Sequence, residues 1–369
     1  MDRRAIEGDA LPACNWPLGH ERTMVIAIHR GWGPERMSSR GIAAARAAAA
    51  LIVFGMVVAC GDAARAGPSV MIDDTTGRVL YAEEPDQTWF PASLTKLMTA
   101  YLTFEAVKSG KLTWETKVPL SEYARGQPAT RIGLRLGIEL NVDQAVRGLI
   151  LRSANDFAVA LAELIGGSEP AFVERMNATA KRLGMSRTHF KNPHGLPDPE
   201  QISTARDLAK LARAILKDFP QQADVFSSPT VKIHKGTFHN GNDLLRTVPG
   251  ADGMKTGFTC GAGYNIVASA TREGKRIIVV VLGSLTRVSR SERATALIEH
   301  GFETVGWKEV LGAPQLAQLS ASPAALTAVH DMSRETRTRM CGNLRGPRRI
   351  RARSAKKKPD SGVQTSAKQ

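Results

Sequence analysis

The sequence predicts an α+β domain in which one antiparallel sheet, flanked by helices, is completed late in the chain. Two short strand patterns around a polar turn occupy residues 69–84, and two more occupy residues 265–284. The stretch between them has helical periodicity instead. Strands at both ends of a helical middle favour a single antiparallel sheet together with a helical subdomain.

The individual elements follow from local signals. The first strand pair, SVMIDDTTGRVLYAEE, turns at the polar residues around Gly77, and the second pair, NIVASATREGKRIIVVVLGS, turns at REG. Pro91 precedes the first helical pattern and Gly110 ends it. Gly184 ends the fourth pattern, and Ser203 is a plausible cap for the fifth. The helical patterns cover residues 92–108, 142–151, 156–165, 169–183, 204–217 and 290–304.

Residues 37–66 have the composition of a secretory signal peptide. Arginines precede an apolar run, and the small-residue pattern Ala-Arg-Ala stands directly before Gly67. We therefore expect the mature chain to begin near Gly67, and residues 1–36 to be an upstream extension ahead of the start at Met37. A buried core helix, an internal anchor and a lipoprotein box with lipid on Cys60 are the alternatives. An exported chain would act in the periplasm or at the outer face of the cytoplasmic membrane.

The formal net charge of +15 is concentrated near the C-terminus. Residues 333–369 hold twelve Lys and Arg against two acids, after an Ala-, Ser- and Pro-rich linker that begins near Leu311. We expect a folded catalytic domain over residues 67–310 and a disordered basic tail over residues 311–369. The tail has no Phe, Trp or Tyr for base stacking, so nucleic acid is not an expected partner. Its charge is compatible with weak association with an anionic membrane surface.

Four cysteines stand at positions 14, 60, 260 and 341, and the first two precede the expected mature chain. Two distant cysteines do not predict a disulfide framework. The paired Cys or His spacing of a zinc site does not occur, so we expect neither a metal nor another cofactor.

The stretch FPASLTKLMTAYLTFEAVKSG, residues 90–110, places Ser93 and Lys96 three positions apart at the start of a very apolar helix. Side chains at i and i+3 share one side of a helical turn. The helix has almost no polar face, so it is expected to be buried. A buried ammonium is costly, and Lys96 therefore either meets an acid or loses its proton. A capping serine beside a lysine that reaches the surface is the alternative.

Two further motifs hold polar residues between predicted elements. Ser153 and Asn155, in LRSANDFAVALAEL, interrupt two helical patterns and are expected in a loop, although a simple helix cap would look the same. Lys255, Thr256 and Gly257, in GADGMKTGFTCGAGYNIVASA, precede an expected strand. Each motif is weak alone. Together, in the order SxxK, SxN, KTG, they form the motif set of penicillin-binding proteins and serine β-lactamases.

Residues 68–306 resemble the low-molecular-mass penicillin-binding proteins, the serine-type D-alanyl-D-alanine carboxypeptidases of peptidase family S11. Besides the three motifs, KNPHGLPDPEQISTARDLAKLARAIL and KTGFTCGAGYNIVASA are similar to sequences of that family. The resemblance implies a β-lactamase/transpeptidase-like fold. It also implies hydrolysis of the terminal D-alanine from D-alanyl-D-alanine stem peptides of peptidoglycan, and covalent inhibition by β-lactam antibiotics.

The resemblance further implies a role for each motif residue. Ser93 would attack the carbonyl between two D-alanines, Lys96 would act as the base, and Ser153 would relay a proton to the leaving amine. The cation and hydroxyl of the KTG motif would hold the terminal carboxylate. The substrate-binding residues would be Asn155, Lys255, Thr256, Gly257 and Phe258.

Phe258 departs from the family pattern, in which many members have histidine at this position. Because the family's oxyanion contact comes from backbone N–H groups, we expect activity to survive this change. A serine β-lactamase would need a glutamate-held water, and the nearest candidate, Glu174, is expected on the polar face of an ordinary helix. A non-catalytic penicillin-binding or wall-binding module is the other alternative. After Leu311 the sequence shows neither the β-rich second domain nor the amphipathic C-terminal helix of larger relatives.

Overall fold

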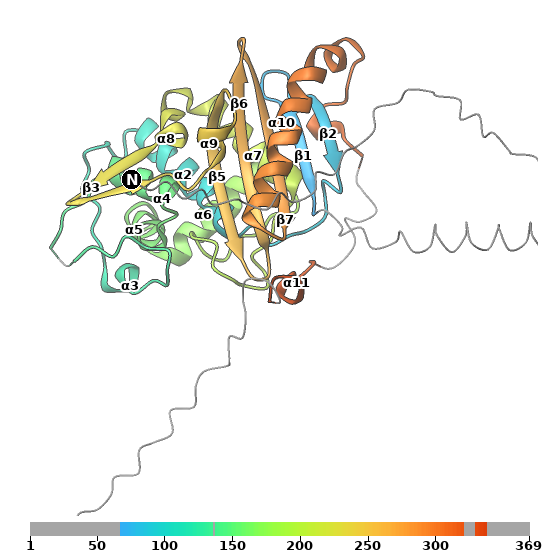
Figure 1. Cartoon of the computed structure of the whole chain (residues 1–369). Helices are drawn as coiled ribbons and strands as arrows, with labels where there is room; N and C mark the ends of the chain where they lie inside the picture. Colours follow the sequence, from blue (N-terminus) through green and yellow to red (C-terminus); the bar gives the residue numbers. More distant parts are fainter. Residues whose placement is uncertain (1–66, 136, 321–328, 338–369) are drawn as a thin grey trace, which may run out of the picture. The chain divides into compact units, whose positions relative to one another are not determined.

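The computed structural model describes residues 67–135, 137–320 and 329–337. The expectations for residues 1–66, namely the upstream extension, the signal peptide and lipid on Cys60, lie outside these residues. Five antiparallel strands form the main sheet in the order β2-β1-β7-β6-β5 (Figure 1). They are β1 (Ser69–Asp73), β2 (Val79–Glu83), β5 (Ala251–Thr259), β6 (Gly263–Arg272) and β7 (Lys275–Ser284). The predicted antiparallel sheet, completed late in the chain, is confirmed.

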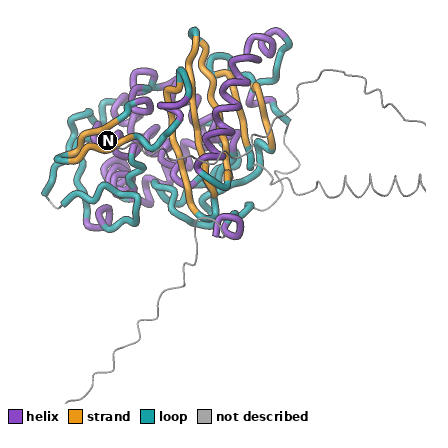
Figure 2. Tube along the Cα trace, in the orientation of Figure 1, coloured by secondary structure: helices purple, strands orange, loops and turns teal. Residues whose placement is uncertain are grey.

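Alternate side chains of the central strands enter two separate cores. Val70 and Ile72 of β1 belong to the core that includes apolar residues of α7 (Ala205–Asp218), whereas Met71 belongs to the core beneath α10 (Arg287–Val310). Neighbouring β7 is buried from Ile277 onwards, because helices cover the sheet on both faces (Figure 2). The long apolar run of this strand is explained by that double coverage.

The remaining helices form a helical part beside β5 (Figure 1). Its central helix, α2, buries ten of its thirteen residues, as its nearly continuous apolar sequence predicts. The predicted helices are confirmed with small shifts at their ends, except that the last, predicted at 290–304, extends over Arg287–Val310. The elements are η1 (Ala92–Thr95), α2 (Lys96–Lys108), α3 (Glu122–Arg125), α4 (Val142–Leu151), α5 (Asn155–Gly166), α6 (Glu169–Arg182), η2 (Pro220–Gln222), α8 (Asp224–Ser227) and α9 (Leu244–Thr247).

Three local expectations differ from the structure. The first turn of the predicted helix 92–108 is a 3-10 turn, η1. The cap of α7 is Thr204, whose side chain accepts from the backbone N–H of Asp207, while Ser203 instead pairs with Trp89. A second hairpin, β3 (Thr230–Ile233) and β4 (Gly236–His239), was not predicted, because four-residue strands with half-exposed polar faces give little periodic signal.

The segment after α10 also differs from the expected disordered tail. Residues 311–320 include η3 (Leu316–Gln318), in which Leu316 is buried. Arg206 of α7 donates to the carbonyl oxygens of Leu316 at 3.1 Å and Leu319 at 2.7 Å. Residues 329–337 contain α11 (Ser333–Arg337), whose Thr336 is fully buried. The packing needs only a few apolar side chains, which composition does not reveal, and the rest of the basic segment lies outside the described residues.

Cys260, in the turn between β5 and β6, is disulfide-bonded. The cysteine spacing predicted no disulfide framework, and it gave no signal for this bond. The other three cysteines of the chain, Cys14, Cys60 and Cys341, all lie outside the described residues. Within the part of the chain that the structure describes, no helix combines the length and apolar character that a membrane crossing requires.

Candidate active site

Ser93 lies in η1, at the point where a tightly constrained loop enters α2. Ala92 has φ +49°, a left-handed conformation that is unfavourable for alanine and must be held by its surroundings. Asn265 of β6 holds the preceding residues, because its Nδ2 donates to the carbonyl oxygens of Phe90 at 3.0 Å and Pro91 at 3.3 Å. Gly195 lies against the same loop, where a Cβ would come within 1.9 Å of the Ala92 oxygen. The serine is thus fixed by packing from two sides.

Lys96 is the first residue of α2 and has no exposed surface. Its Nζ contacts Ser93 Oγ at 3.1 Å and Asn155 Oδ1 at 2.7 Å, and also donates to the backbone oxygen of His194. All three partners are neutral oxygens. Burial lowers the pKa of Lys96 well below its ordinary range, and the charge of Lys255 lowers that pKa further. The predicted buried lysine is confirmed, and its environment favours the neutral amine.

Ser153 and Asn155 are held by the junction between α4 and α5. Ser153 has φ +61°, and its hydroxyl oxygen is buried with no hydrogen-bond partner among the described residues. Asn155 is the first residue of α5, rather than a loop residue, and its Nδ2 donates to the oxygen of Pro128 at 2.9 Å. A strained serine with an unused hydroxyl is a common mark of a functional position.

Lys255, Thr256 and Gly257 precede the predicted strand, which is β6, and themselves lie within β5, a strand that was not predicted. Apolar alternation is hidden here because the strand carries the polar groups of the site. A Cβ on Gly257 would lie 3.0 Å from the Ser93 nitrogen and 3.2 Å from the Leu94 nitrogen, so glycine lets β5 approach the serine closely.

Lys255 itself is buried, and burial together with the charge of Arg290 lowers its pKa to about 7. Phe258 is partly exposed at the same edge, and its ring packs 4.2 Å from the ring of Tyr264, centroid to centroid.

Some of the predicted site residues are hydrogen-bonded to one another, whereas others are related to the site by proximity or by the effect of their charge. Ser93, Lys96 and Asn155 share hydrogen bonds, and Gly257 adjoins the Ser93 backbone. Lys255 acts on Lys96 through its charge.

Four residues at or beside the site were not predicted: His194, Arg290, Asn265 and Asp156. The charge of Asp156 raises the pKa of Lys96, against the larger lowering by burial and by Lys255. His194 is buried with its pKa lowered to about 3, chiefly by burial, so it is neutral at physiological pH. Arg290 of α10 is buried near Lys255, and burial lowers its pKa to about 10. No spacing rule links these positions to Ser93. The local signals available for His194 and Asn265 were the segments KNPHGL and GYNIV, which contain them.

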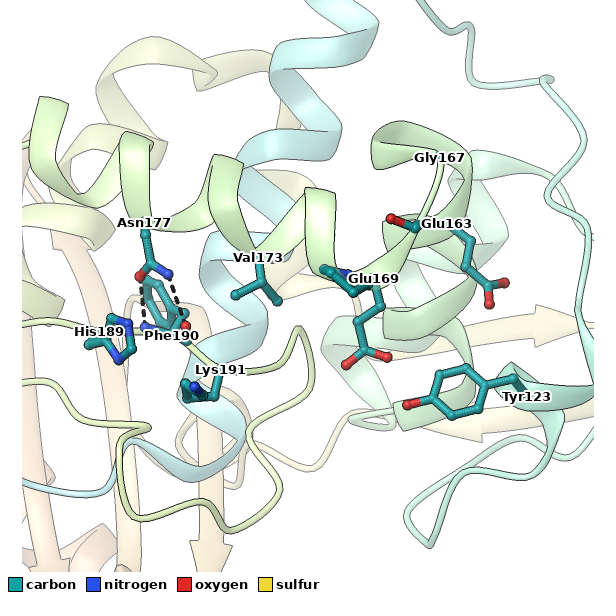
Figure 3. A pocket seen from close by; sticks show the side chains of 11 residues that line it. Tyr123, Glu163, Gly167, Glu169, Val173, Asn177, His189, Phe190 and Lys191 are labelled. Atoms are coloured by element: carbon teal, nitrogen blue, oxygen red, sulfur yellow. Dashed lines mark hydrogen bonds between the residues drawn. The ribbon is translucent and has the colours of Figure 1, made fainter.

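A separate cavity lies elsewhere in the helical part (Figure 3). It has a volume of about 780 Å³ and is lined from α3, α5, α6 and the loop at Lys191. Figure 3 shows Tyr123 and Glu169 pointing toward each other, while Asn177 is tied to the backbone of Phe190 by two hydrogen bonds. Glu169 Oε2, in the lining of the cavity, is buried with no hydrogen-bond partner among the described residues. Across the described ranges, no group of three His, Cys, Asp or Glu side chains is placed to hold a metal ion.

The site combines a serine hydroxyl with a buried lysine whose pKa is lowered, next to the cation Lys255 on β5. This arrangement is typical of enzymes in which a lysine activates a serine for acyl transfer. The comparisons with known proteins agree with this class. The family model of the D-alanyl-D-alanine carboxypeptidases, peptidase family S11, matches residues 57–286. The chain therefore belongs to this family, as the resemblance of its motifs indicated.

Individual relatives show how far the similarity extends. The D-alanyl-D-alanine carboxypeptidase DacA of Haemophilus influenzae is 41% identical over 239 residues, which cover 63% of this chain and 61% of that protein. Penicillin binding protein 5 from Haemophilus influenzae has a TM-score of 0.63 and 41% identity, covering 64% of this chain and 71% of that chain. Penicillin-binding protein D2 from Listeria monocytogenes, in an ampicillin-bound form, has a TM-score of 0.60 and 35% identity, covering 64% of this chain and 97% of that chain.

These similarities confirm the penicillin-binding protein fold. The matched region spans less than two thirds of the length of the Haemophilus carboxypeptidase.

Proposed function

We propose that this protein is a serine D-alanyl-D-alanine carboxypeptidase, which removes the terminal D-alanine from peptidoglycan stem peptides through an acyl-enzyme. The observation that carries the proposal is the contact of 3.1 Å between Ser93 Oγ and the Nζ of the fully buried Lys96. Family membership supports it independently. A neutral amine at hydrogen-bond distance from a serine is a general base that requires no histidine.

In the proposed reaction, Lys96 Nζ takes the proton of Ser93 Oγ as this oxygen attacks the carbonyl carbon between the two D-alanines. The carbonyl oxygen becomes an oxyanion, which the backbone N–H groups of Ser93 and Phe258 stabilise by about 3 kcal/mol each. The C–N bond then breaks, and the leaving amine receives a proton through Ser153. Water hydrolyses the resulting ester with Lys96 again as base, which restores the free Ser93 hydroxyl.

Lys255 and Thr256 hold the carboxylate at the C-terminus of the substrate in this proposal. Arg290, buried near Lys255, adds a second positive charge at that end of the site. Asn155 binds the peptide backbone, and the close approach at Gly257 leaves room for the substrate to lie along β5, one of the two edge strands of the sheet. Two cations at one end explain a requirement for a free terminal carboxylate.

β-Lactam antibiotics are the expected covalent inhibitors, because they acylate the same serine. The Listeria relative, solved in an ampicillin-bound form, supports this expectation. The signal peptide proposed for residues 37–66 would place the enzyme in the periplasm or at the outer face of the cytoplasmic membrane, where its substrate lies. Weak association of the basic C-terminal segment with the membrane surface belongs to the same proposal.

The test is release of D-alanine from a peptide ending in D-Ala-D-Ala, with labelled penicillin capture and nitrocefin turnover measured on the same preparation. Stoichiometric penicillin capture together with repeated D-alanine release supports the proposal. Rapid nitrocefin turnover without D-alanine release would indicate a β-lactamase, although Glu174 is exposed on α6. Penicillin capture alone would indicate a non-catalytic binding module.

A further inference from the structure

The pairing of β6 with β7 is interrupted at Asn265. The register shifts between Tyr264 and Ile266, so that residues 282 and 283 of β7 stand opposite Asn265 alone. Gly283 has φ +72°, a left-handed conformation that glycine adopts readily. This arrangement is a β-bulge, a feature that bends a strand, changes the direction of a side chain and is frequent beside active sites.

The side chain of Asn265 links the bulge to the segment before Ser93. Its Oδ1 accepts from the backbone N–H of Gly283 at 2.9 Å. Its Nδ2 donates to the carbonyl oxygens of Phe90 at 3.0 Å and Pro91 at 3.3 Å. The side chain is fully buried, and these three partners are all backbone groups. A carboxamide of this length supplies both the acceptor for the one N–H and the donor for the two oxygens.

The segment that Asn265 holds is strained. Ala92 has φ +49°, which is unfavourable for alanine and persists only where the surroundings impose it. The Pro91 oxygen, which accepts from Asn265, also accepts from the N–H of Leu94 at 3.1 Å. The hydrogen bonds of Asn265 therefore act on the residues directly before Ala92 and Ser93. Relaxation of Ala92 would turn the Ser93 hydroxyl and N–H away from their present positions.

Two further contacts fix this segment to the same part of the sheet. Gly257 of β5 stands directly opposite Asn265, so its missing side chain leaves room on the face that Asn265 uses. Trp89 packs on Gly283, where a Cβ would lie 2.3 Å from its Cζ2, and Trp89 Nε1 donates to the oxygen of Ala262 at 2.8 Å. The bulge, Asn265 and Trp89 thus hold one side of the segment.

We propose that Asn265 is a positioning residue for the acylation step. Through the bulge between β6 and β7, it holds the backbone before Ser93 so that the hydroxyl and N–H of this serine are in place for attack. None of its hydrogen bonds reaches Ser93 Oγ or Lys96 Nζ, so it acts through the backbone. The kinetic role rests on the proposed function, whereas the hold on the segment does not.

The first test is acylation of full-length variants by a fluorescent penicillin, followed over a range of penicillin concentrations. Asn265→Asp keeps the shape and the acceptor for Gly283, but it turns an oxygen instead of an N–H toward Phe90 and Pro91. At about pH 8 the maximal acylation rate should fall about a hundredfold, on the scale of a misplacement of about 1 Å. The penicillin concentration that gives half of this rate should change by less than about twofold.

Acidification supplies a rescue that a purely structural role does not predict. Near pH 5.5 the introduced carboxyl, buried beside carbonyl oxygens, takes up a proton and regains a donor. The ratio of the variant's rate to the wild-type rate at the same pH should therefore rise by about tenfold between pH 8 and pH 5.5. Taking the ratio at each pH removes the titration of Lys96 and Lys255, which both proteins share.

Asn177→Asp is the matched control. Asn177 also joins backbone groups, because it donates to the oxygen of Phe190 at 2.9 Å and accepts from the N–H of that residue at 2.8 Å. This variant should lose thermal stability but keep an acylation rate within about twofold of wild type. If Asn265→Asp does not fold, the uncharged Asn265→Ala decides, with an expected loss of about tenfold to a hundredfold. A folded Asn265 variant that acylates at the wild-type rate would overturn the positioning role, and so would a loss in Asn265→Asp that acidification leaves unchanged.

Hydrogen–deuterium exchange tests the hold on the segment without any enzymatic activity. In Asn265→Asp at about pH 8, the peptide that contains Leu94 should exchange about tenfold faster than in wild type, because the N–H of Leu94 bonds to the Pro91 oxygen that Asn265 holds. In Asn177→Asp this peptide should exchange at the wild-type rate. Unchanged exchange in Asn265→Asp would overturn the positioning role. A wild-type chain that penicillin does not acylate, with the exchange difference present, would refute the proposed function and leave the hold by Asn265 standing.

Discussion

Replacing Lys96 with arginine separates a neutral base from a structural cation. The Nζ of Lys96 lies 3.1 Å from Ser93 Oγ and is surrounded by neutral oxygens, in a position with no exposed surface. Arginine keeps its charge at any practical pH and cannot accept the serine proton. If Lys96 acts as the base, Lys96→Arg should therefore fail as badly as Lys96→Ala.

The expected loss is about a hundred- to ten-thousand-fold in acylation rate, the usual effect of removing a general base. This corresponds to about 2.7–5.5 kcal/mol of transition-state stabilisation. The larger guanidinium must also fit into a filled pocket, which costs about 1–3 kcal/mol of folding stability. Thermal unfolding of each variant distinguishes this stability loss from the loss of the base.

The assay is the stopped-flow rate of acylation by a fluorescent penicillin, alongside D-alanine release from the peptide. Lys255→Arg is the matched control, because a cation that only holds a carboxylate is partly replaceable by another cation. We expect this variant to lose about tenfold at most, on the scale of one weakened charged contact. If Lys96→Arg retained more than about a tenth of the wild-type rate, the neutral-base role would be wrong and Ser153 would become the candidate that activates Ser93.

The remaining predictions concern the strand edge, the pH dependence and the segment after α10. Gly257→Ala should lower the acylation rate more than about tenfold. The new Cβ would lie 3.0 Å from the Ser93 nitrogen and 3.2 Å from the Leu94 nitrogen, and β5 would have to move away from the serine. An unchanged rate in a folded variant would contradict this prediction. The KM for a peptide with a free carboxylate should rise between pH 7 and pH 9, because Lys255, whose pKa is about 7, loses its positive charge over this range. In Lys255→Arg, whose charge does not titrate, the same KM profile should be flat. Truncation after Val310 should lower the unfolding temperature by several degrees. Arg206 would lose its hydrogen bonds to the oxygens of Leu316 and Leu319, and the buried Leu316 side chain would be removed. An unchanged unfolding temperature would show that these contacts do not stabilise the fold.

The sequence predicted the parts of this fold whose signals are local. The helix α2 is buried, as its apolar composition predicts, and burial lowers the pKa of Lys96, its first residue. The contact between Ser93 and Lys96 was predictable because side chains three positions apart lie on the same side of a helical turn. The sheet was predicted from the strongly apolar β7 and its neighbours. The KTG residues precede β6 as predicted, but β5, in which they lie, was not predicted because the polar groups of the site hide its alternation.

The missed features depend on contacts between distant parts of the chain. Arg290, on α10, is near Lys255 because α10 packs against the sheet whose edge strand is β5, and no sequence spacing predicts that proximity. Asn265 reaches back 175 positions to hold Phe90. Residues 329–337 fall within the predicted disordered tail, since two buried residues, Met332 and Thr336, leave little trace in a basic, low-complexity composition.

The central claim is that Ser93 forms the acyl-enzyme, and peptide mapping of the penicillin adduct tests it most directly. The full-length chain is treated with a slowly hydrolysed penicillin, quenched, digested and analysed by tandem mass spectrometry. We expect one adduct per chain, on Ser93, and no adduct together with no D-alanine release in Ser93→Ala. An adduct on Ser153 or another residue, or D-alanine release that persists in Ser93→Ala, would contradict the mechanism.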